Sequence, residues 1–202
     1  MLFRSDRYDD VIEGIAAAKS AGLNPIKINT VLMRGINDDE ALPLLKWALK
    51  ENLNLRFIEQ MPLDAGDAWT RKNLVTADEI FNQINSEYEL TPVEERGSSP
   101  AEEFLVNGGP AKVGIIGSVT RTFCANCDRL RLTSDGQLRN CLFANTETDL
   151  RGILRNGRLA EFEKRSDILK AFSTTVKSKL SGHGINDPEF VKPVRPMSAI
   201  GG

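Results

Sequence analysis

The sequence of 202 residues is poor in cysteine and histidine, with three cysteines and one histidine. The odd number of cysteines and the lack of an apolar signal segment at the N-terminus argue against a disulfide framework and favour the reducing cytoplasm. No apolar run reaches the roughly 18 residues of a membrane span. The net charge of −2 gives no global basic field. We therefore expect neither a membrane nor a nucleic acid as partner, and any anion site must be local.

What the chain does contain is an alternation of helical and strand patterns over its first 95 residues. Apolar residues recur at helical spacing or alternate with polar ones, and Thr76 with Glu79 forms a capping-box signature. The expected helices cover residues 8–22, 36–52 and 76–88, and the expected strands cover residues 24–33 and 53–61. This order predicts parallel βα units. Because a complete barrel of such units needs about 250 residues, we expect an α/β fold with an incomplete barrel, the second part of something larger.

The pattern changes after residue 95, where glycine, serine and proline give loop signals. A further strand is expected at residues 112–119, and two helices at 148–157 and 163–180. The residues from 181 onward show little periodicity and are expected to form an irregular tail. We therefore expect two domains: the barrel part at 1–95, and an extension at 96–202 that contains a β-hairpin and helices.

All three cysteines lie in one short segment of the chain. Two residues separate Cys124 from Cys127, and thirteen separate Cys127 from Cys141. Such clustering is unusual for cysteines that only fill a core. A structural zinc ion needs a fourth ligand, which would have to be His183. A cubane iron–sulfur cluster uses thiolates at this spacing, and three of them would leave one iron open to a substrate atom, whereas an electron-transfer protein would normally use four. The spacing alone leaves these alternatives open.

The residues between the last two cysteines predict a β-hairpin with a loop at 134–136. If Gly136 takes the left-handed conformation, Leu132 pairs with Leu138, and a slip by one residue would exchange the two faces. Because the planar guanidinium group suits phosphate, arginines on the cysteine face indicate an anionic substrate. The leucine face holds Leu130, Leu132 and Leu138, and the arginine face holds Arg129, Arg131, Arg139 and Cys141.

The segment FCANCDRLRLTSDGQLRNCLF closely resembles the C-terminal cluster motif of the MoaA family, the radical S-adenosylmethionine (SAM) enzymes that act as GTP 3′,8-cyclases in molybdenum-cofactor biosynthesis. The segments IKINTVLMRGINDDE, LRFIEQMPL, VRPM and the terminal IGG resemble further motifs of this family, in the same order. The resemblance extends from Arg7 to Gly202, and it is a resemblance to the C-terminal portion of such an enzyme.

The resemblance implies a fold, an activity and a set of site residues. The family folds as an incomplete TIM-like barrel with a C-terminal iron–sulfur extension. One 4Fe-4S cluster, held by a C-x3-C-x2-C motif, cleaves SAM to give a radical, and a second, C-terminal 4Fe-4S cluster binds GTP through its open iron. The implied roles are cluster ligation for Cys124, Cys127 and Cys141, GTP contact for Lys27, Arg129, Leu130 and Arg131, SAM contact for Met61, and a catalytic tail for Gly201 and Gly202.

The chain departs from the family in one respect, because it has no C-x3-C-x2-C motif and no cysteine left to build one. We therefore expect a lyase component that binds GTP but does not complete the reaction by itself, and that needs the missing N-terminal half or an equivalent chain. A barrel cut at its middle exposes strand edges, so we also expect self-association, for example as a homodimer. The alternative is a non-catalytic zinc-binding interaction module that uses the three cysteines and His183.

Overall fold

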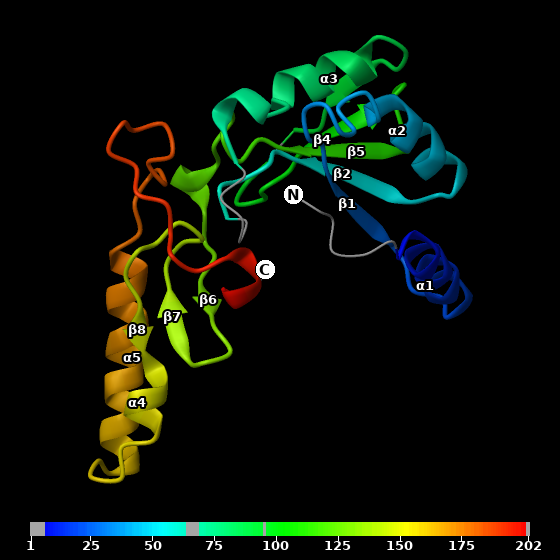
Figure 1. Ribbon diagram of the computed structural model, residues 1–202. Coiled ribbons are helices and arrows are strands. Elements are labelled where there is room, and N and C mark those ends of the chain that lie inside the picture. The colour runs from blue at the N-terminus through cyan, green and yellow to red at the C-terminus, as the bar shows by residue number, and fades with distance from the viewer. Residues whose placement is uncertain (1–6, 64–68, 95, 201–202) are drawn as a thin grey trace. The chain divides into compact units, whose positions relative to one another are not determined.

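The computed structural model describes residues 7–63, 69–94 and 96–200 (Figure 1). Within these residues the chain divides into two compact units, the first of residues 7–61 and 69–122 and the second of residues 62–63 and 123–200. The domain boundary expected after residue 95 lies inside the first unit, because the strands on either side of that position belong to one sheet.

The first unit is built on a five-stranded sheet in the order β1-β2-β5-β4-β3. Strands β1, β2 and β5 run parallel, β4 is antiparallel to β5, and β3 is antiparallel to β4. The expected parallel βα units are therefore confirmed, whereas a barrel is not, because these strands form one open sheet with β1 and β3 at its edges. The strands are β1 (Lys27–Val31), β2 (Asn54–Ile58), β3 (Leu90–Pro92), β4 (Glu102–Val106) and β5 (Lys112–Ile116).

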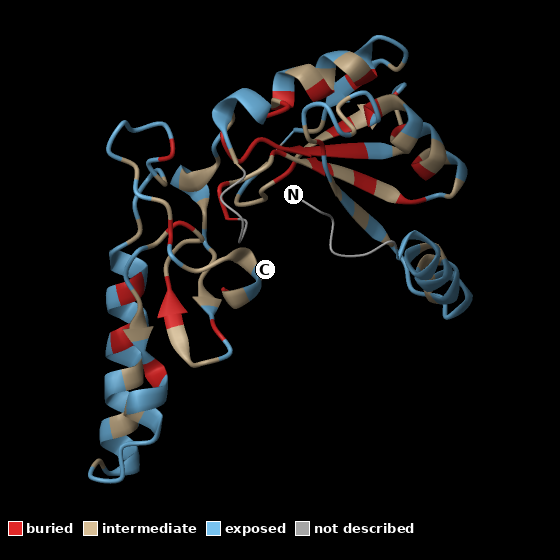
Figure 2. Cartoon of the chain, viewed as in Figure 1, coloured by how far each residue is buried: buried red, intermediate tan, exposed pale blue. Residues whose placement is uncertain are grey.

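Helices α2 (Ala41–Lys50) and α3 (Ala77–Asn85) pack on one face of this sheet, and the hydrophobic core of the unit lies between the helices and the sheet. Figure 2 shows the buried residues concentrated on β2, β5 and the helix faces turned toward them. The expected capping box is confirmed at the start of α3, where the Thr76 hydroxyl accepts the Glu79 N–H and the Glu79 carboxylate accepts the Thr76 N–H. The sheet residues at the centre of this core are Leu55, Phe57, Val113 and Ile115, each at most 1% exposed.

Helix α1 (Tyr8–Ser20) forms as expected but contains no buried residue. Its apolar stripe reaches the core only through Ile15, while Val11 is 58% exposed. A salt bridge of 2.7 Å from Lys19 to Glu51 links the end of α1 to the end of α2. A short 3-10 helix, η1 (Arg71–Asn73), precedes α3.

The second unit combines a three-stranded antiparallel sheet, in the order β6-β7-β8, with two helices. A small core joins the sheet to the helices through Leu138, Leu150 and Ala171. The elements are η2 (Cys124–Asn126), β6 (Arg131–Leu132), β7 (Gln137–Arg139), β8 (Thr148–Asp149), α4 (Leu150–Leu154), α5 (Glu161–Lys177) and η3 (Met197–Ala199).

The hairpin register expected from the sequence is confirmed, with Leu132 opposite Leu138 and Arg131 opposite Arg139. Gly136 has a φ of +85°, in the left-handed region, and the Thr133 N–H donates to the Gln137 carbonyl across the loop at 3.0 Å. Leu132 differs from expectation because it is 60% exposed. Leu132 lies at the end of β6, beside the turn. Its side chain lines a hollow that is open to solvent and is also lined by residues of α4.

The C-terminal segment is irregular, as expected, but it is anchored to the rest of its unit. Ile200 is fully buried, and the Met197 N–H donates to the Leu63 carbonyl at 3.0 Å. The Arg195 guanidinium binds both carboxylate oxygens of Asp135, at 3.2 and 2.8 Å, and also contacts Glu147. Arg195 therefore ties the C-terminal segment to the turn of the hairpin.

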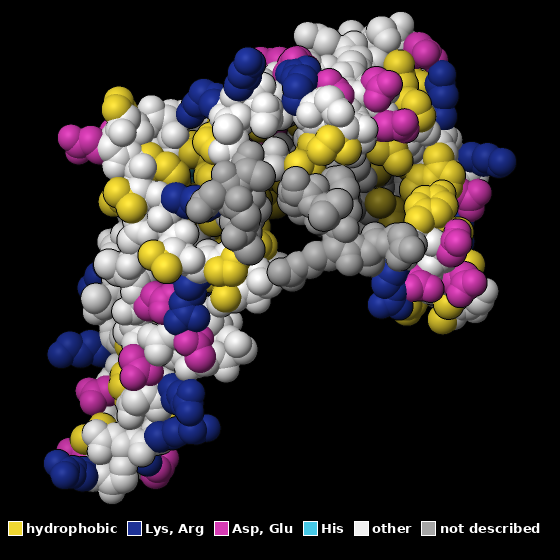
Figure 3. Space-filling view, viewed as in Figure 1, with side chains coloured by type: hydrophobic (Ala, Val, Ile, Leu, Met, Phe, Trp, Pro, Cys, Tyr) yellow, Lys and Arg dark blue, Asp and Glu magenta, His cyan; other side chains and the backbone are white. Residues whose placement is uncertain are grey.

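Charges of both signs are mixed on the face of the molecule in Figure 3, where lysines and arginines lie among aspartates and glutamates. This mixture agrees with the net charge of −2. Within the described parts of the chain, no helix is both long and apolar enough to cross a bilayer.

Candidate metal centre and nucleotide site

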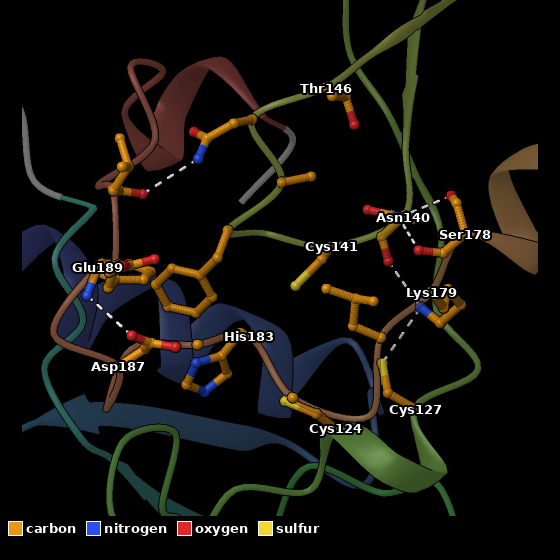
Figure 4. A pocket seen from close by; sticks show the side chains of 18 residues that line it. Cys124, Cys127, Asn140, Cys141, Thr146, Ser178, Lys179, His183, Asp187 and Glu189 are labelled. Atoms are coloured by element: carbon orange, nitrogen blue, oxygen red, sulfur yellow. Dashed lines mark hydrogen bonds between the residues drawn. The ribbon is translucent and has the colours of Figure 1, made fainter.

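The three cysteines line a single cavity of about 520 Å³ in the second unit (Figure 4). Cys124 opens the 3-10 turn η2, Cys127 directly follows that turn, and Cys141 lies two residues beyond the end of β7. The turn is closed by the Cys127 N–H, which donates to the Cys124 carbonyl at 3.1 Å. All three thiols are half-buried and none is in a disulfide. The hairpin and the turn therefore bring residues seventeen positions apart in the sequence to one site.

Positive groups surround Cys127. The Arg129 Nη2 atom lies 3.5 Å from the Cys127 Sγ atom, and the Lys179 Nζ atom lies 3.8 Å from it. Burial acts to raise the pKa of the Cys127 thiol. Hydrogen bonds from the backbone and guanidinium of Arg129, together with the charges of Arg129 and Lys179, outweigh burial and hold this pKa below its ordinary value.

Cys124 has the opposite environment. The pKa of its thiol is raised, first by burial and then by electrostatic repulsion from Cys141 and Cys127. If all three were deprotonated, the thiolates would repel one another, and a positively charged group bound between them would relieve that repulsion.

The described geometry bears on the alternative of a single metal ion. Among the described residues, no group of three or more cysteine, histidine or carboxylate side chains stands close enough to hold one ion. In a cubane cluster each thiolate binds a different iron, so the ligands stand further apart. The His183 Nδ1 atom accepts the Ile185 N–H at 3.2 Å, and its ring packs on Phe143 with the centroids 4.6 Å apart. The zinc site with His183 as fourth ligand is therefore not favoured.

Arg131 in β6 and Arg129, two residues before it, are both close enough to the cysteines to interact with them electrostatically. Arg129 stacks over the Phe123 ring, with 4.8 Å from its Cζ atom to the ring centroid. Burial lowers the pKa of Arg131, and the charge of Arg129 acts in the same direction, while the thiolates of Cys141 and Cys127 oppose both. Arg131 is thus a partly desolvated cation close to another cation, an arrangement that an anion would stabilise.

Leu130 points the other way and packs against the apolar cluster of the second unit. Arg129, Leu130 and Arg131, all within the described chain, are not among the residues that line the cavity in Figure 4. The arginines therefore approach the cysteines from outside that cavity, which the sequence pattern could not show.

Lys27 and Met61 belong to the first unit. Lys27 is exposed on the sheet face that α2 and α3 leave uncovered, where Asn29 and Arg56 stand in register. Sequence reasoning missed Arg56, although its alternation with buried neighbours in β2 could have indicated it. Gly114, opposite Arg56 in β5, leaves room for the Arg56 side chain, because a Cβ atom there would lie 3.0 Å from the Arg56 Cγ atom. Met61 follows β2 and is half-buried; Gly201 and Gly202 lie outside the described residues.

Sequence reasoning also missed Glu59, a carboxylate that is 1% exposed. It accepts the N–H groups of Ala77, Val119 and Thr120 at 2.6, 2.7 and 2.9 Å, and the Thr120 hydroxyl as well. Because both carboxylate oxygens accept hydrogen bonds, the cost of burying this polar group is offset. Glu59 therefore ties the end of β2 to the start of α3 and to the segment after β5. A single acid directly after an apolar strand was the available signal.

Comparison with known proteins identifies the family. Residues 53–185 match the family model described as Molybdenum Cofactor Synthesis C. The chain is similar to the GTP 3′,8-cyclase of Streptomyces coelicolor, with 55% identity over 203 residues, covering 100% of this chain and 58% of the relative. It is also similar to the GTP 3′,8-cyclases of Mycolicibacterium smegmatis and Rhodococcus opacus, with 50% identity each, covering 100% of this chain and 56% of each relative.

The chain therefore spans little more than half the length of these curated relatives. The matches confirm the resemblance that the cysteine segment and the four other motifs indicated. Because the family model matches more than half of the chain, the chain belongs to the Molybdenum Cofactor Synthesis C family.

Proposed function

We propose that this chain is the GTP-binding part of a GTP 3′,8-cyclase of molybdenum-cofactor biosynthesis. Cys124, Cys127 and Cys141 would hold a 4Fe-4S cluster that has one iron without a protein ligand. The observation that carries the proposal is the convergence of Cys124, Cys127 and Cys141 on one cavity. The names of the relatives supply the substrate, GTP.

A bound cluster would supply a Lewis-acidic iron for a nitrogen or oxygen donor of the nucleotide base. The residues of the chain would bind and orient the rest of the substrate. Arg129 and Arg131 would neutralise part of its phosphate charge, since charge-assisted hydrogen bonds from guanidinium groups to phosphate are strong and directional. Leu130 would fix the spacing between the two arginines by packing on the opposite face of the strand.

Residues of the first unit would serve the same reaction. Lys27 on the open sheet face offers a further cation to the nucleotide, and Met61 would contact SAM. Gly201 and Gly202 would reach the SAM side of the active site. Because the sequence contains no C-x3-C-x2-C motif, the reductive cleavage of SAM would need a partner segment that carries it.

Anaerobic reconstitution with iron and sulfide tests the proposal. We expect about four irons per chain and a broad brown absorbance, because three thiolates suffice for a cubane with one open iron. Cys124→Ala and Cys141→Ala should abolish the absorbance, while Arg158→Ala, at an exposed position of the same unit, should retain it. GTP added to the reconstituted chain should perturb the spectrum of the reduced cluster. One zinc per chain without colour would contradict the proposal and support the interaction module.

A further inference from the structure

Lys179 makes three contacts around the cysteine site. Its ammonium group donates to the Arg129 carbonyl at 2.7 Å, to the Asn140 carbonyl at 2.7 Å and to the Cys127 Sγ atom at 3.8 Å. Figure 4 shows the side chain lying between Asn140 and Cys127. Because an ammonium group has three donors and no acceptor, each of its hydrogen atoms has a partner.

These contacts lie where the hairpin ladder ends. The paired residues of β6 and β7 stop at Arg131 opposite Arg139. The two carbonyls that Lys179 binds come from Arg129, before β6, and from Asn140, after β7. Lys179 thus bridges the two segments at the point where they separate to carry Cys127 and Cys141.

The backbone of Lys179 is itself held in place. It lies two residues after the end of α5, a helix that packs on β7 through Ala171 and Leu138. The Asn140 side-chain amide donates to the Ser178 carbonyl and to the Ser178 Oγ atom, both at 3.0 Å. Lys179 donates to the Asn140 carbonyl, and the Asn140 side chain donates to Ser178. Each of the two segments therefore donates hydrogen bonds to the other.

We propose that Lys179 is a positioning residue that sets the separation of the Cys127 and Cys141 segments and donates a charge-assisted hydrogen bond to the Cys127 sulfur. The first effect is a property of the protein chain and needs no cluster. The second effect, on a bound cluster, rests on the proposed function. Hydrogen bonds to the sulfur ligands and nearby charge tune the reduction potential of iron–sulfur clusters, and loss of an outer-shell partner typically lowers metal affinity about 10–100-fold.

Lys179→Met removes the ammonium group and keeps the length of the side chain. The matched control is Lys177→Met, which removes one positive charge from an exposed position in the last turn of the same helix. Lys179→Arg keeps the charge and several donors, so it should restore part of the effect.

The first readout is amide hydrogen exchange of the full 202-residue chain without iron. Peptides covering residues 127–132 and 139–144 should exchange roughly tenfold faster in Lys179→Met, as expected for loss of hydrogen bonds to a charged group, and should be unchanged in Lys177→Met. A peptide over β2 in the first unit is the internal reference. Unchanged exchange in Lys179→Met, or an equal rise over all peptides, would overturn the positioning role.

The second readout is the reconstituted chain. Lys179→Met should lose iron to a chelator about 10–100-fold faster, and its midpoint potential should become more negative because a positive charge near the cluster is gone. Equal potentials and retention in Lys179→Met and Lys177→Met would overturn the hydrogen bond to Cys127. If the unmodified chain takes up no cluster, the proposed function fails, while the exchange experiment still decides the positioning role.

Discussion

The turn of the cysteine hairpin depends on Gly136, and Gly136→Ala is the sharpest test of the hairpin geometry. The backbone there has a φ of +85°. A Cβ atom at this position would lie 2.6 Å from the Arg151 Cβ atom and 3.4 Å from the Arg151 backbone nitrogen. The Gly136 carbonyl also accepts the N–H groups of Leu150 and Arg151, at 3.0 and 3.3 Å. The turn is therefore held against the start of α4 and cannot easily move away.

Two costs combine in Gly136→Ala. A left-handed conformation costs an L-residue about 1–2 kcal/mol, and overpacking against neighbours that cannot yield costs about 1–3 kcal/mol. The reduced freedom of the unfolded chain returns about 0.4–1 kcal/mol. We expect a net loss of about 3 kcal/mol in the local stability of the hairpin, which corresponds to roughly 100-fold faster exchange.

Two other glycines of the same unit separate these costs. Gly184 has a φ of +72° but space around it, with Phe190 at 4.0 Å from an added Cβ atom. Gly184→Ala should therefore cost about 1 kcal/mol. Gly157 lies outside the left-handed region and has nothing within 4 Å of an added Cβ atom, so Gly157→Ala should be neutral or slightly stabilising.

The assay is native-state hydrogen exchange at the Thr133 N–H, which donates across the turn to the Gln137 carbonyl. The three variants should rank Gly157→Ala, Gly184→Ala and Gly136→Ala in order of increasing exchange rate. If Gly136→Ala exchanges no faster than Gly184→Ala, the contact with Arg151 yields without cost, and the argument that it fixes the turn is wrong.

Three further predictions concern binding, pH and the buried carboxylate. Arg131→Ala should weaken GTP binding by the reconstituted chain about tenfold or more; calorimetry beside Arg158→Ala checks this, and equal affinities would leave Arg131 without a substrate role. The hydrogen bond from Arg195 lowers the pKa of Asp135 from 3.8 to about 2, so this carboxylate stabilises the fold above about pH 4 and ceases to do so as the pH falls toward 2. The difference in unfolding free energy between the unmodified chain and Asp135→Asn should shrink across that window; a difference that stays constant would show that the pair is not formed. Glu59→Gln places an amide NH2 group among N–H donors and should destabilise the first unit by about 2–3 kcal/mol, and a urea midpoint unchanged from that of the unmodified chain would contradict the network.

Local rules allowed the sequence to determine the elements and the register of the candidate site. Loop length and the alternation of leucine with arginine were sufficient to place Leu132 opposite Leu138, because a slip by one residue would have turned the buried Leu138 away from the core. The capping box at Thr76 was readable because its partners lie three residues apart. The clustering of the cysteines indicated a site because its residue types and spacing suit thiolate ligation.

The tertiary structure decided which distant residues complete these local patterns. Lys179 meets Cys127 across 52 positions, Arg195 meets Asp135 across 60, and Glu59 meets Thr120 across 61. No local pattern marks one lysine among many as the partner of a thiol, because each contact depends on how the helices and strands pack. The same holds for β4, which joins the sheet antiparallel to β5 and so shifts the unit boundary beyond residue 95. Periodicity reports how a segment is buried along its own axis, whereas the choice of neighbour is made only when the whole chain has folded.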